Sequence, residues 1–311
     1  MAKILDFCKN HNFFKDNILA YLIFVTILWA FSFPLIGYFV SGAMDSFFAA
    51  FFRVFLAFLV FLPSLDFRTP NALKLALMGV GALQIGVMYL FYYHSFLYLS
   101  VSEVALFTIF TPFYVSVVYD IFSKKFRAMY LLSIAICVFG AFVIKFDAIN
   151  PRFLTGFVLI QLANFAFGTG QSLYKIIIEK EGALNQRGVF GYFHLGAMIV
   201  TAIAFLALGA WNLPATPQSW AVLIYLGVVA SGVGYFLWNK GAVCVDSGVL
   251  AIMNNALIPT AIVADALLVA VFFPEKSVDF SANEMLRIAL GTSIMLFSLW
   301  LHYKIIKRLE N

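Results

Sequence analysis

The chain has 311 residues, of which 63% are hydrophobic and 11% are charged, and its mean hydropathy is +0.97. This composition excludes a soluble globular domain, in which charged residues make up about a quarter of the total. The formal net charge of +5 does not indicate a nucleic-acid partner, because the basic residues lie in short loops between apolar segments, where they mark membrane topology.

Ten apolar segments are long enough to cross a bilayer as helices, which takes about 20 residues each. The first segment is longer than the apolar core of a cleavable signal peptide, about 7 to 15 residues, so we expect it to be retained. The predicted helices span 18–40, 45–63, 72–97, 102–122, 128–146, 153–173, 188–210, 218–240, 248–272 and 284–303.

The basic residues divide unevenly when successive loops are assigned to opposite sides of the membrane. Fifteen of the twenty Lys and Arg residues fall on the side that holds both termini, and four fall on the other. The positive-inside rule places the richer side in the cytoplasm. We therefore predict that both termini are cytoplasmic.

The two halves of the chain resemble each other at an offset of 146 residues. This offset places Gly81 on Gly227 and Tyr89 on Tyr235. Five helices per repeat is an odd number, so the second copy must enter the membrane from the opposite side. The sequence thus predicts two inverted repeats, 18–146 and 153–303, with a substrate site near the midplane where they meet, as in secondary transporters.

Arg53 is the remaining basic residue, and it falls deep inside a predicted helix. It lies eight residues into the second helix, roughly 12 Å deep at about 1.5 Å per residue. Two interpretations stay open. Arg53 forms a structural ion pair with Glu103 or Asp265, or its guanidinium faces a cavity and holds a substrate carboxylate.

Glu103 follows Ser100 with the spacing of a capping box, which satisfies free amides at the start of a helix. The repeat counterpart of Ser100 is Asp246, a good N-cap for the ninth helix. A cap is therefore the favoured role of Glu103. Glu103 and Asp265 are also the candidates for carrying a coupling proton.

Side-chain amides within the apolar segments are the next group of candidates. Gln84, Asn164, Asn254 and Asn255 each offer donors and an acceptor. They serve either as hydrogen-bonding contacts between helices or as ligands for a substrate. Adjacent asparagines on one helix point about 100° apart, so we expect Asn254 or Asn255 to face the cavity.

Among the aromatic residues, Trp29, Tyr89 and Tyr235 stand beside glycine or polar residues in the repeated segments. They are candidates for the apolar wall of a substrate site. Trp238 has a second interpretation, a place in the aromatic belt at the membrane surface.

A set of short strings between about residues 25 and 260 matches one family pattern. These strings are Ile27-Leu28-Trp29-Ala30-Phe31-Ser32-Phe33, Asp45-Ser46 with Arg53-Val54, Gly81-Ala82-Leu83-Gln84, Val101-Ser102-Glu103, Tyr119-Asp120-Ile121 with Ser123-Lys124, and most of 227–255. The chain resembles the EamA-type drug/metabolite transporter superfamily and, within it, the biotin uptake transporters.

This resemblance implies an all-α polytopic membrane protein with ten transmembrane helices in two inverted five-helix repeats. It implies import of biotin across the bacterial inner membrane by alternating access. Arg53 then suits the carboxylate of biotin, and Gln84, Asn164, Asn254 and Asn255 suit its ureido ring. The expected partners are biotin and the lipid bilayer, with a homodimer also allowed for and no nucleic acid.

Two other functions compete with biotin import. One is export of amino acids or related metabolites, and the other is a membrane enzyme acting on a lipid or isoprenoid. The enzyme is disfavoured because no acidic metal-binding pair, nucleophile motif or histidine cluster appears, and Cys8, Cys137 and Cys244 lie in no metal-ligand spacing. We therefore expect neither enzymatic activity nor a metal or cofactor.

Overall fold

The computed structural model describes residues 18–124, 128–144, 153–182, 184–273 and 281–310. Eight helical spans in these ranges are long and apolar enough to cross a membrane. With the shorter apolar helix α9 and the 29-residue helix α10, the described part of the chain has ten helical spans. We call each span a rod, whether it is one helix or several consecutive helical elements. The predicted all-helical, ten-helix architecture is thus confirmed.

The rods follow one another along the chain with short connections. Their elements, in order, are α2 (Ile18–Ala30) with α3 (Ser32–Phe39); α4 (Ser46–Phe61) with η1 (Leu62–Ser64); α5 (Asn71–Gly81), η2 (Ala82–Val87) and α6 (Met88–Ser95); α7 (Val101–Phe107), η3 (Thr108–Phe110) and α8 (Thr111–Ser123); α9 (Ala128–Ile144); α10 (Phe153–Glu181); α11 (Gln186–Leu208); α12 (Pro217–Ile224), η4 (Tyr225–Val233) and α13 (Gly234–Cys244); α14 (Ser247–Phe272); and α15 (Ala282–Glu310).

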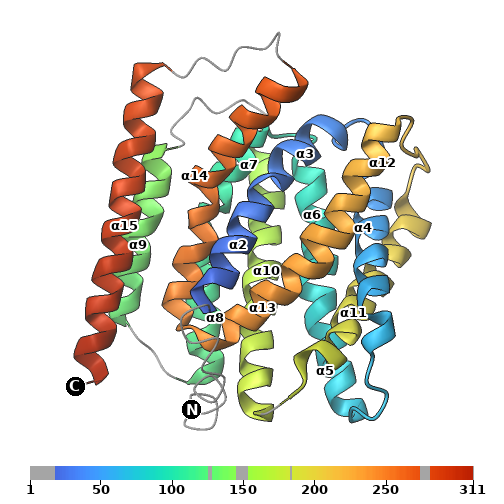
Figure 1. Cartoon of the computed structure of the whole chain (residues 1–311), viewed down its shortest axis with the longest axis horizontal. Helices are drawn as coiled ribbons and strands as arrows, with labels where there is room; N and C mark the ends of the chain where they lie inside the picture. The colour runs from blue at the N-terminus through green and yellow to red at the C-terminus, as the bar shows by residue number, and fades with distance from the viewer. Residues whose placement is uncertain (1–17, 125–127, 145–152, 183, 274–280, 311) are drawn as a thin grey trace.

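Corresponding helices of the two halves make corresponding contacts with the other half. The first rod packs on α13 and α14, and the sixth rod, α10, packs in the same way on α6 and α8. The second rod, α4, contacts α11, and α9 stands beside α15 at the left edge of Figure 1. Two inverted repeats related by a pseudo-twofold axis are expected to show such matching contacts. The boundary at residue 146 lies outside the described residues, and the division into repeats that end at 146 and begin at 153 stays a prediction.

The third and eighth rods share an irregularity at equivalent positions. Each contains a π-helical segment, η2 and η4, which overlap at the offset of 146. Gly81 and Gly227 lie at their starts and allow close packing. A Cβ on Gly81 would lie 1.8 Å from the carbonyl oxygen of Phe193, and a Cβ on Gly227 would lie 3.1 Å from that of Arg53. Phe193 and Arg53 therefore occupy equivalent places in the two halves, although they lie 140 residues apart, six fewer than the offset that relates the two glycines.

Prolines account for the interruptions of the first and fourth rods. Pro34 follows the break between α2 and α3, and Pro112 follows the 3₁₀ turn η3. Proline cannot donate the helical hydrogen bond and displaces the preceding turn. Such breaks are tolerated in a membrane where neighbouring groups satisfy the freed backbone. Both breaks adjoin the cavity described below.

The sixth helix is longer than predicted. The prediction ended it at residue 173 and placed Lys175 in a loop, but α10 continues to Glu181 and ends where Gly182 adopts a positive φ of 75°. Lys175 is buried in the helix. The prediction failed because it counted apolar residues, whereas neighbouring helices satisfy the polar groups of this last part.

Successive rods run in opposite directions, so the molecule has two ends. We call the end at which α2 begins and α15 ends the inner end, which is at the bottom of Figure 1, and the opposite end the outer end. The sidedness of these ends in the membrane stays a prediction.

Candidate functional site

A cavity lies between the two halves and encloses about 740 Å³ of space, part of it open to the outside. Its walls come from both halves of the chain, and most are apolar. The lining residues are Thr26, Trp29, Ser32, Phe33, Ile36, Arg53, Met88, Tyr89, Tyr92, Thr108, Thr111, Ala163, Asn164, Phe167, Tyr235, Trp238, Asn254 and Leu257. A largely apolar cavity with a few polar groups is typical of a small-molecule site.

Equivalent positions of the two repeats line this cavity. Tyr89 is 146 residues from Tyr235, and Thr108 is 146 residues from Asn254; all four line the wall. The cavity therefore surrounds the axis that relates the halves.

Arg53 reaches the cavity from α4 and is held by several neutral groups. Its Nε donates to the carbonyl oxygen of Leu226 at 3.0 Å and to Oγ of Ser231 at 2.5 Å. Its Nη1 donates to the hydroxyl of Tyr93 at 3.2 Å. The guanidinium carbon lies 4.5 Å from the centre of the Tyr89 ring, a distance at which the ring face stabilises a cation.

The Arg53 side chain is 3% exposed, yet no carboxylate of the described residues lies within salt-bridge distance of it. The predicted structural ion pair with Glu103 or Asp265 is therefore wrong. A buried cation held only by neutral acceptors retains most of its attraction for an anion. The cavity is where such an anion can approach.

The π segment η4 supplies part of this arrangement. A π-helical segment shifts the backbone hydrogen bonds, and such segments occur frequently at functional sites. Here the carbonyl oxygen of Leu226 accepts from Arg53, and that of Ala230 accepts from Nε1 of Trp29 at 2.8 Å. The irregular segment thus fixes the orientation of both side chains.

Aromatic rings form the inner wall of the cavity. The ring centroid of Trp29 lies 4.7 Å from that of Tyr235 and 5.0 Å from that of Trp238. Trp238 is 1% exposed, and its Nε1 donates to Gln171 at 3.2 Å. The prediction that placed Trp238 in the interfacial belt is therefore wrong, and its polar partner explains how an indole can be buried so deeply.

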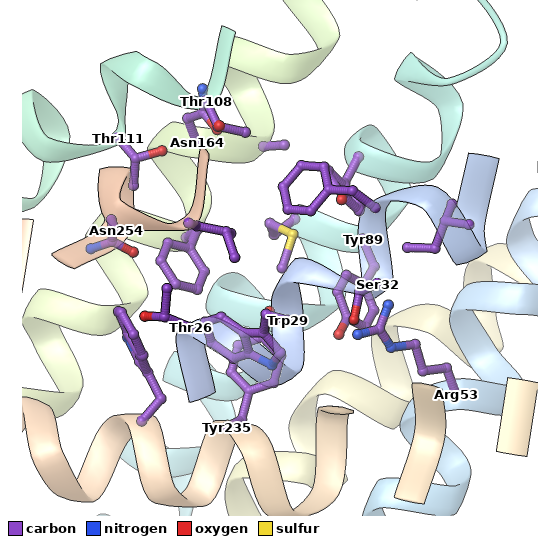
Figure 2. Close-up of a pocket in the computed structure, with 18 residues that line it drawn as sticks. Thr26, Trp29, Ser32, Arg53, Tyr89, Thr108, Thr111, Asn164, Tyr235 and Asn254 are labelled. Carbon is purple, nitrogen blue, oxygen red and sulfur yellow. The ribbon is translucent and has the colours of Figure 1, made fainter. Parts of the chain in front are cut away.

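Amides and hydroxyls lie on the side of the cavity away from Arg53, as Figure 2 shows. Nδ2 of Asn164 donates to the carbonyl oxygen of Phe107 at 2.8 Å, and Nδ2 of Asn254 donates to that of Leu250 at 2.9 Å. These bonds use the nitrogens, so within the described residues the two amide oxygens keep their capacity to accept. Thr111 adds a hydroxyl to the same region.

Two of the predicted site residues lie outside the cavity wall. Gln84 is fully buried and exchanges hydrogen bonds with Asn239 at 3.0 and 3.4 Å. Asn255, also fully buried, donates to the carbonyl oxygen of Ile109 at 3.2 Å. Both amides join helices of opposite halves, which is the alternative role that the sequence left open.

The carboxylates predicted to cap helices do so. Oε2 of Glu103 accepts from the backbone nitrogen of Ser100 at 2.8 Å, while Oγ of Ser100 accepts from the backbone nitrogen of Glu103 at 3.3 Å. Oδ1 of Asp246 accepts from the backbone nitrogen of Gly248 at 2.8 Å. Asp265 interacts with Tyr38 near the outer end. Neither Glu103 nor Asp265 lines the cavity.

The sequence reasoning missed several polar lining residues, among them Ser32, Thr108 and Thr111. Thr108 could have been found, because it is the repeat counterpart of Asn254. Ser32 and Thr111 carried no such signal, because a hydroxyl within an apolar helix is more often bonded to its own backbone.

The helical membrane fold and the cavity shared by its two halves define a multi-pass transporter. A family model for EamA-like transporters matches residues 17–146. A biotin transporter of Salmonella typhimurium is 42% identical over 289 residues, covering 92% of this chain and 93% of the relative. The chain belongs to the EamA-like transporter family.

Other relatives extend this similarity. A biotin transporter of Escherichia coli K12 is 43% identical over 290 residues, which cover 92% of this chain and 93% of the relative. A probable biotin transporter of Pseudomonas aeruginosa is 42% identical over 91% of this chain and 96% of its own. A solved crystal structure shares the fold with a TM-score of 0.71 at 14% identity, covering 95% of this chain and 99% of that one.

Proposed function

We propose that this protein imports biotin across the inner membrane of a bacterium. The observation that carries the proposal is the buried charge of Arg53, which lines the cavity and has no carboxylate partner among the described residues. The proposal is supported by the relatives named as biotin transporters, which match nearly the whole chain.

The carboxylate of biotin would bind beside Arg53. The hydrogen bonds of Arg53 within the described chain use Nε and Nη1, so Nη2 is left to donate to a substrate. Oγ of Ser32 is buried, has no hydrogen-bond partner among the residues that the structure describes, and lines the same part of the cavity (Figure 2). Together they offer two donors to a carboxylate, which suits a charge-assisted interaction.

The ureido ring of biotin would bind on the opposite side of the cavity. A ureido group has two N–H donors and one carbonyl acceptor, and the amide oxygens of Asn164 and Asn254 can accept from the former. The hydroxyl of Thr111 can donate to the carbonyl. Trp29 and Tyr235 would pack against the apolar part of the substrate between these two groups.

The same cavity disfavours an amino-acid exporter. An amino acid carries an ammonium group beside its carboxylate, and a buried ammonium group requires an acidic or multiple-acceptor partner. Arg53 is the charged residue among the lining side chains of the described chain, and it has the same sign as the ammonium group. Export of amino acids therefore finds less support in the site than import of biotin.

Orientation and coupling belong to the proposal as well. We place the inner end in the cytoplasm, as the distribution of basic residues predicts. Transport of the biotin anion is made electroneutral by one accompanying proton, for which Glu103 and Asp265 stay the candidates. A homodimer stays a prediction.

Growth on trace biotin provides the test. A strain that can neither make nor import biotin is given this gene, and membrane expression is verified. We expect growth at biotin concentrations that do not support the parent strain, and purified protein in liposomes to take up labelled biotin in a saturable manner. Absence of both despite verified expression would remove biotin as the substrate.

A further inference from the structure

We propose that two latches, one at each end of the cavity, close the transport path in turn. The inner latch consists of Tyr119, Lys175 and Glu179, and the outer latch consists of Tyr38, Ser41 and Asp265. Each must open while the other stays closed. This inference rests on the packing of the helices and is independent of which substrate the cavity binds.

The inner latch ties three rods together below the cavity. The hydroxyl of Tyr119 on α8 donates to Oε2 of Glu179 on α10 at 2.8 Å. Nζ of Lys175, one turn earlier on α10, lies 3.0 Å from Oε1 of Glu179. Lys175 is 3% exposed, which requires that its charge be compensated.

Lys175 also holds the inner end of the eighth rod. Its Nζ donates to the carbonyl oxygens of Ala242, Val243 and Val245 at 3.0, 2.9 and 2.7 Å. These carbonyls lie at the C-terminus of α13, where free carbonyl groups and the helix dipole favour a cation. One ammonium group therefore joins the end of α13 to α10, and through Glu179 to α8.

The outer latch uses the equivalent places of the other repeat. The hydroxyl group of Ser41, which follows α3, donates to the carbonyl oxygen of Phe96 at the end of α6 at 3.3 Å. Tyr38 on α3 interacts with the carboxylate group of Asp265 on α14. Phe96 is 146 residues from Ala242, and Tyr119 is 146 residues from Asp265.

The two latches thus join corresponding elements at opposite ends of the molecule. The first rod holds the ends of α6 and α14 on the outside, and its repeat counterpart α10 holds the ends of α13 and α8 on the inside. Tyr119 lies eight residues inward from the lining residue Thr111, and Asp265 lies eight residues outward from Leu257. This distance is roughly 12 Å in each case.

The latches differ in strength. The inner one contains an ion pair and three further charge-assisted contacts of Lys175, whereas the outer one has one carboxylate and two hydroxyl groups. Hydrogen bonds to charged groups are stronger than neutral ones. We infer that the protein without substrate rests with its inner end closed.

Labelling of a cysteine inside the cavity tests this inference without any substrate. Cys8, Cys137 and Cys244 are replaced by alanine, and Thr26, which lines the cavity, is replaced by cysteine as the reporter. A membrane-impermeant methanethiosulfonate reagent is added to right-side-out or to inverted vesicles. The rate of labelling from each side reports which end is open.

Glu179→Gln removes the negative charge of the inner latch and should shift the balance toward the inward-open state. Since a charge-assisted hydrogen bond contributes about a factor of ten to an equilibrium, labelling from the cytoplasmic side should rise by about that factor and fall from the other side. Asp265→Asn should shift both rates in the opposite direction. Tyr119→Phe, which removes one hydroxyl group, should act as Glu179→Gln does but more weakly.

Glu181→Gln is the matched control, because Glu181 lies two residues away on the same helix and is exposed. It should leave both rates unchanged. Unaltered labelling in Glu179→Gln and Tyr119→Phe would overturn the proposal. A rise from both sides would also overturn it, because that result indicates a loosened structure. Failure of biotin uptake alone would bear on the proposed substrate and leave the latches standing.

Discussion

Arg53 is a residue whose candidate role depends on its surroundings. In the sequence, Arg53 stands out by its depth within the predicted second helix. The sequence alone does not distinguish an ion pair from a substrate contact. Its neighbours exclude the ion pair within the described part of the chain, since carbonyl and hydroxyl groups orient the guanidinium without neutralising it. Contact with a substrate stays a proposal. Those neighbours come from a π segment and a distant tyrosine, which a linear pattern does not reveal.

Replacing Arg53 by Gln should abolish the preference for a carboxylate. The wild type should bind biotin at least about tenfold more tightly than biotinamide, because a hydrogen bond to a charged group contributes about 1.5 to 3 kcal/mol. Arg53→Gln should bind both compounds equally weakly, as measured by calorimetry in detergent. Arg68→Gln, an exposed arginine on a loop, should keep the preference. An undiminished preference in Arg53→Gln would show that the carboxylate binds elsewhere.

Asn254 and Asn255 are neighbours with different roles. Asn254→Ala should raise the KM for biotin several-fold with little change in thermal stability, because Asn254 lines the cavity and bonds its own helix. Asn255→Ala should instead lower thermal stability, because it leaves the carbonyl group of Ile109 unpaired. The expected loss is about 0.6 kcal/mol, up to about 1.7 kcal/mol. Uptake kinetics and thermal unfolding in detergent are measured on both variants. A raised KM in Asn255→Ala together with a lowered stability in Asn254→Ala would contradict the prediction.

At the scale of elements, the apolar segments predicted the helices well but not their ends or irregularities. Segment counting found ten helices, yet it ended α10 too early, at residue 173, and gave no sign of the π segments. Both failures have one cause. Polar and backbone groups in a membrane are satisfied by other helices, and a single sequence without tertiary contacts does not show which ones.

Close packing at the start of η2 can be tested with a pair of glycines. Gly81→Ala should lower the melting temperature by several degrees, because the new Cβ would collide with the backbone of Phe193 and overpacking costs about 1 to 3 kcal/mol. Gly79→Ala meets no atom within 4 Å and should be neutral or slightly stabilising. Thermal unfolding of both variants in detergent provides the comparison. Equal melting temperatures of Gly81→Ala and Gly79→Ala would contradict the close approach of Gly81 to the backbone of Phe193.

At the scale of the whole molecule, the internal offset of 146 residues was the most informative feature of the sequence. It predicted inverted halves, and the packing of the helices shows the matching contacts expected of them. It also relates pairs of residues that line the cavity and, as we propose, its two latches. The composition of the site was less predictable, because the offset shows which positions are equivalent but not which of them face inward.

Energy coupling is a property of the whole transporter. An inside-negative potential opposes entry of the biotin anion by about 2.3 kcal/mol per 100 mV, so uptake into liposomes should increase when an inward proton gradient is imposed. Glu103→Gln keeps a residue that completes a capping box but cannot carry a proton, and Asp265→Asn is the corresponding change at the other candidate. Loss of the response in one of them would identify the carrier. Uptake that ignores the gradient in the wild type would exclude symport.

The equivalence of Arg53 and Phe193 has a consequence for how cargo travels. The scaffold is duplicated, but only one of the two matching places carries a positive charge. An anionic substrate therefore has one positively charged group to bind, and this group is the same in the outward-open and the inward-open state. Such a substrate would keep a fixed orientation during transport. Molecules that must rotate within the cavity in order to leave it would be excluded regardless of their size.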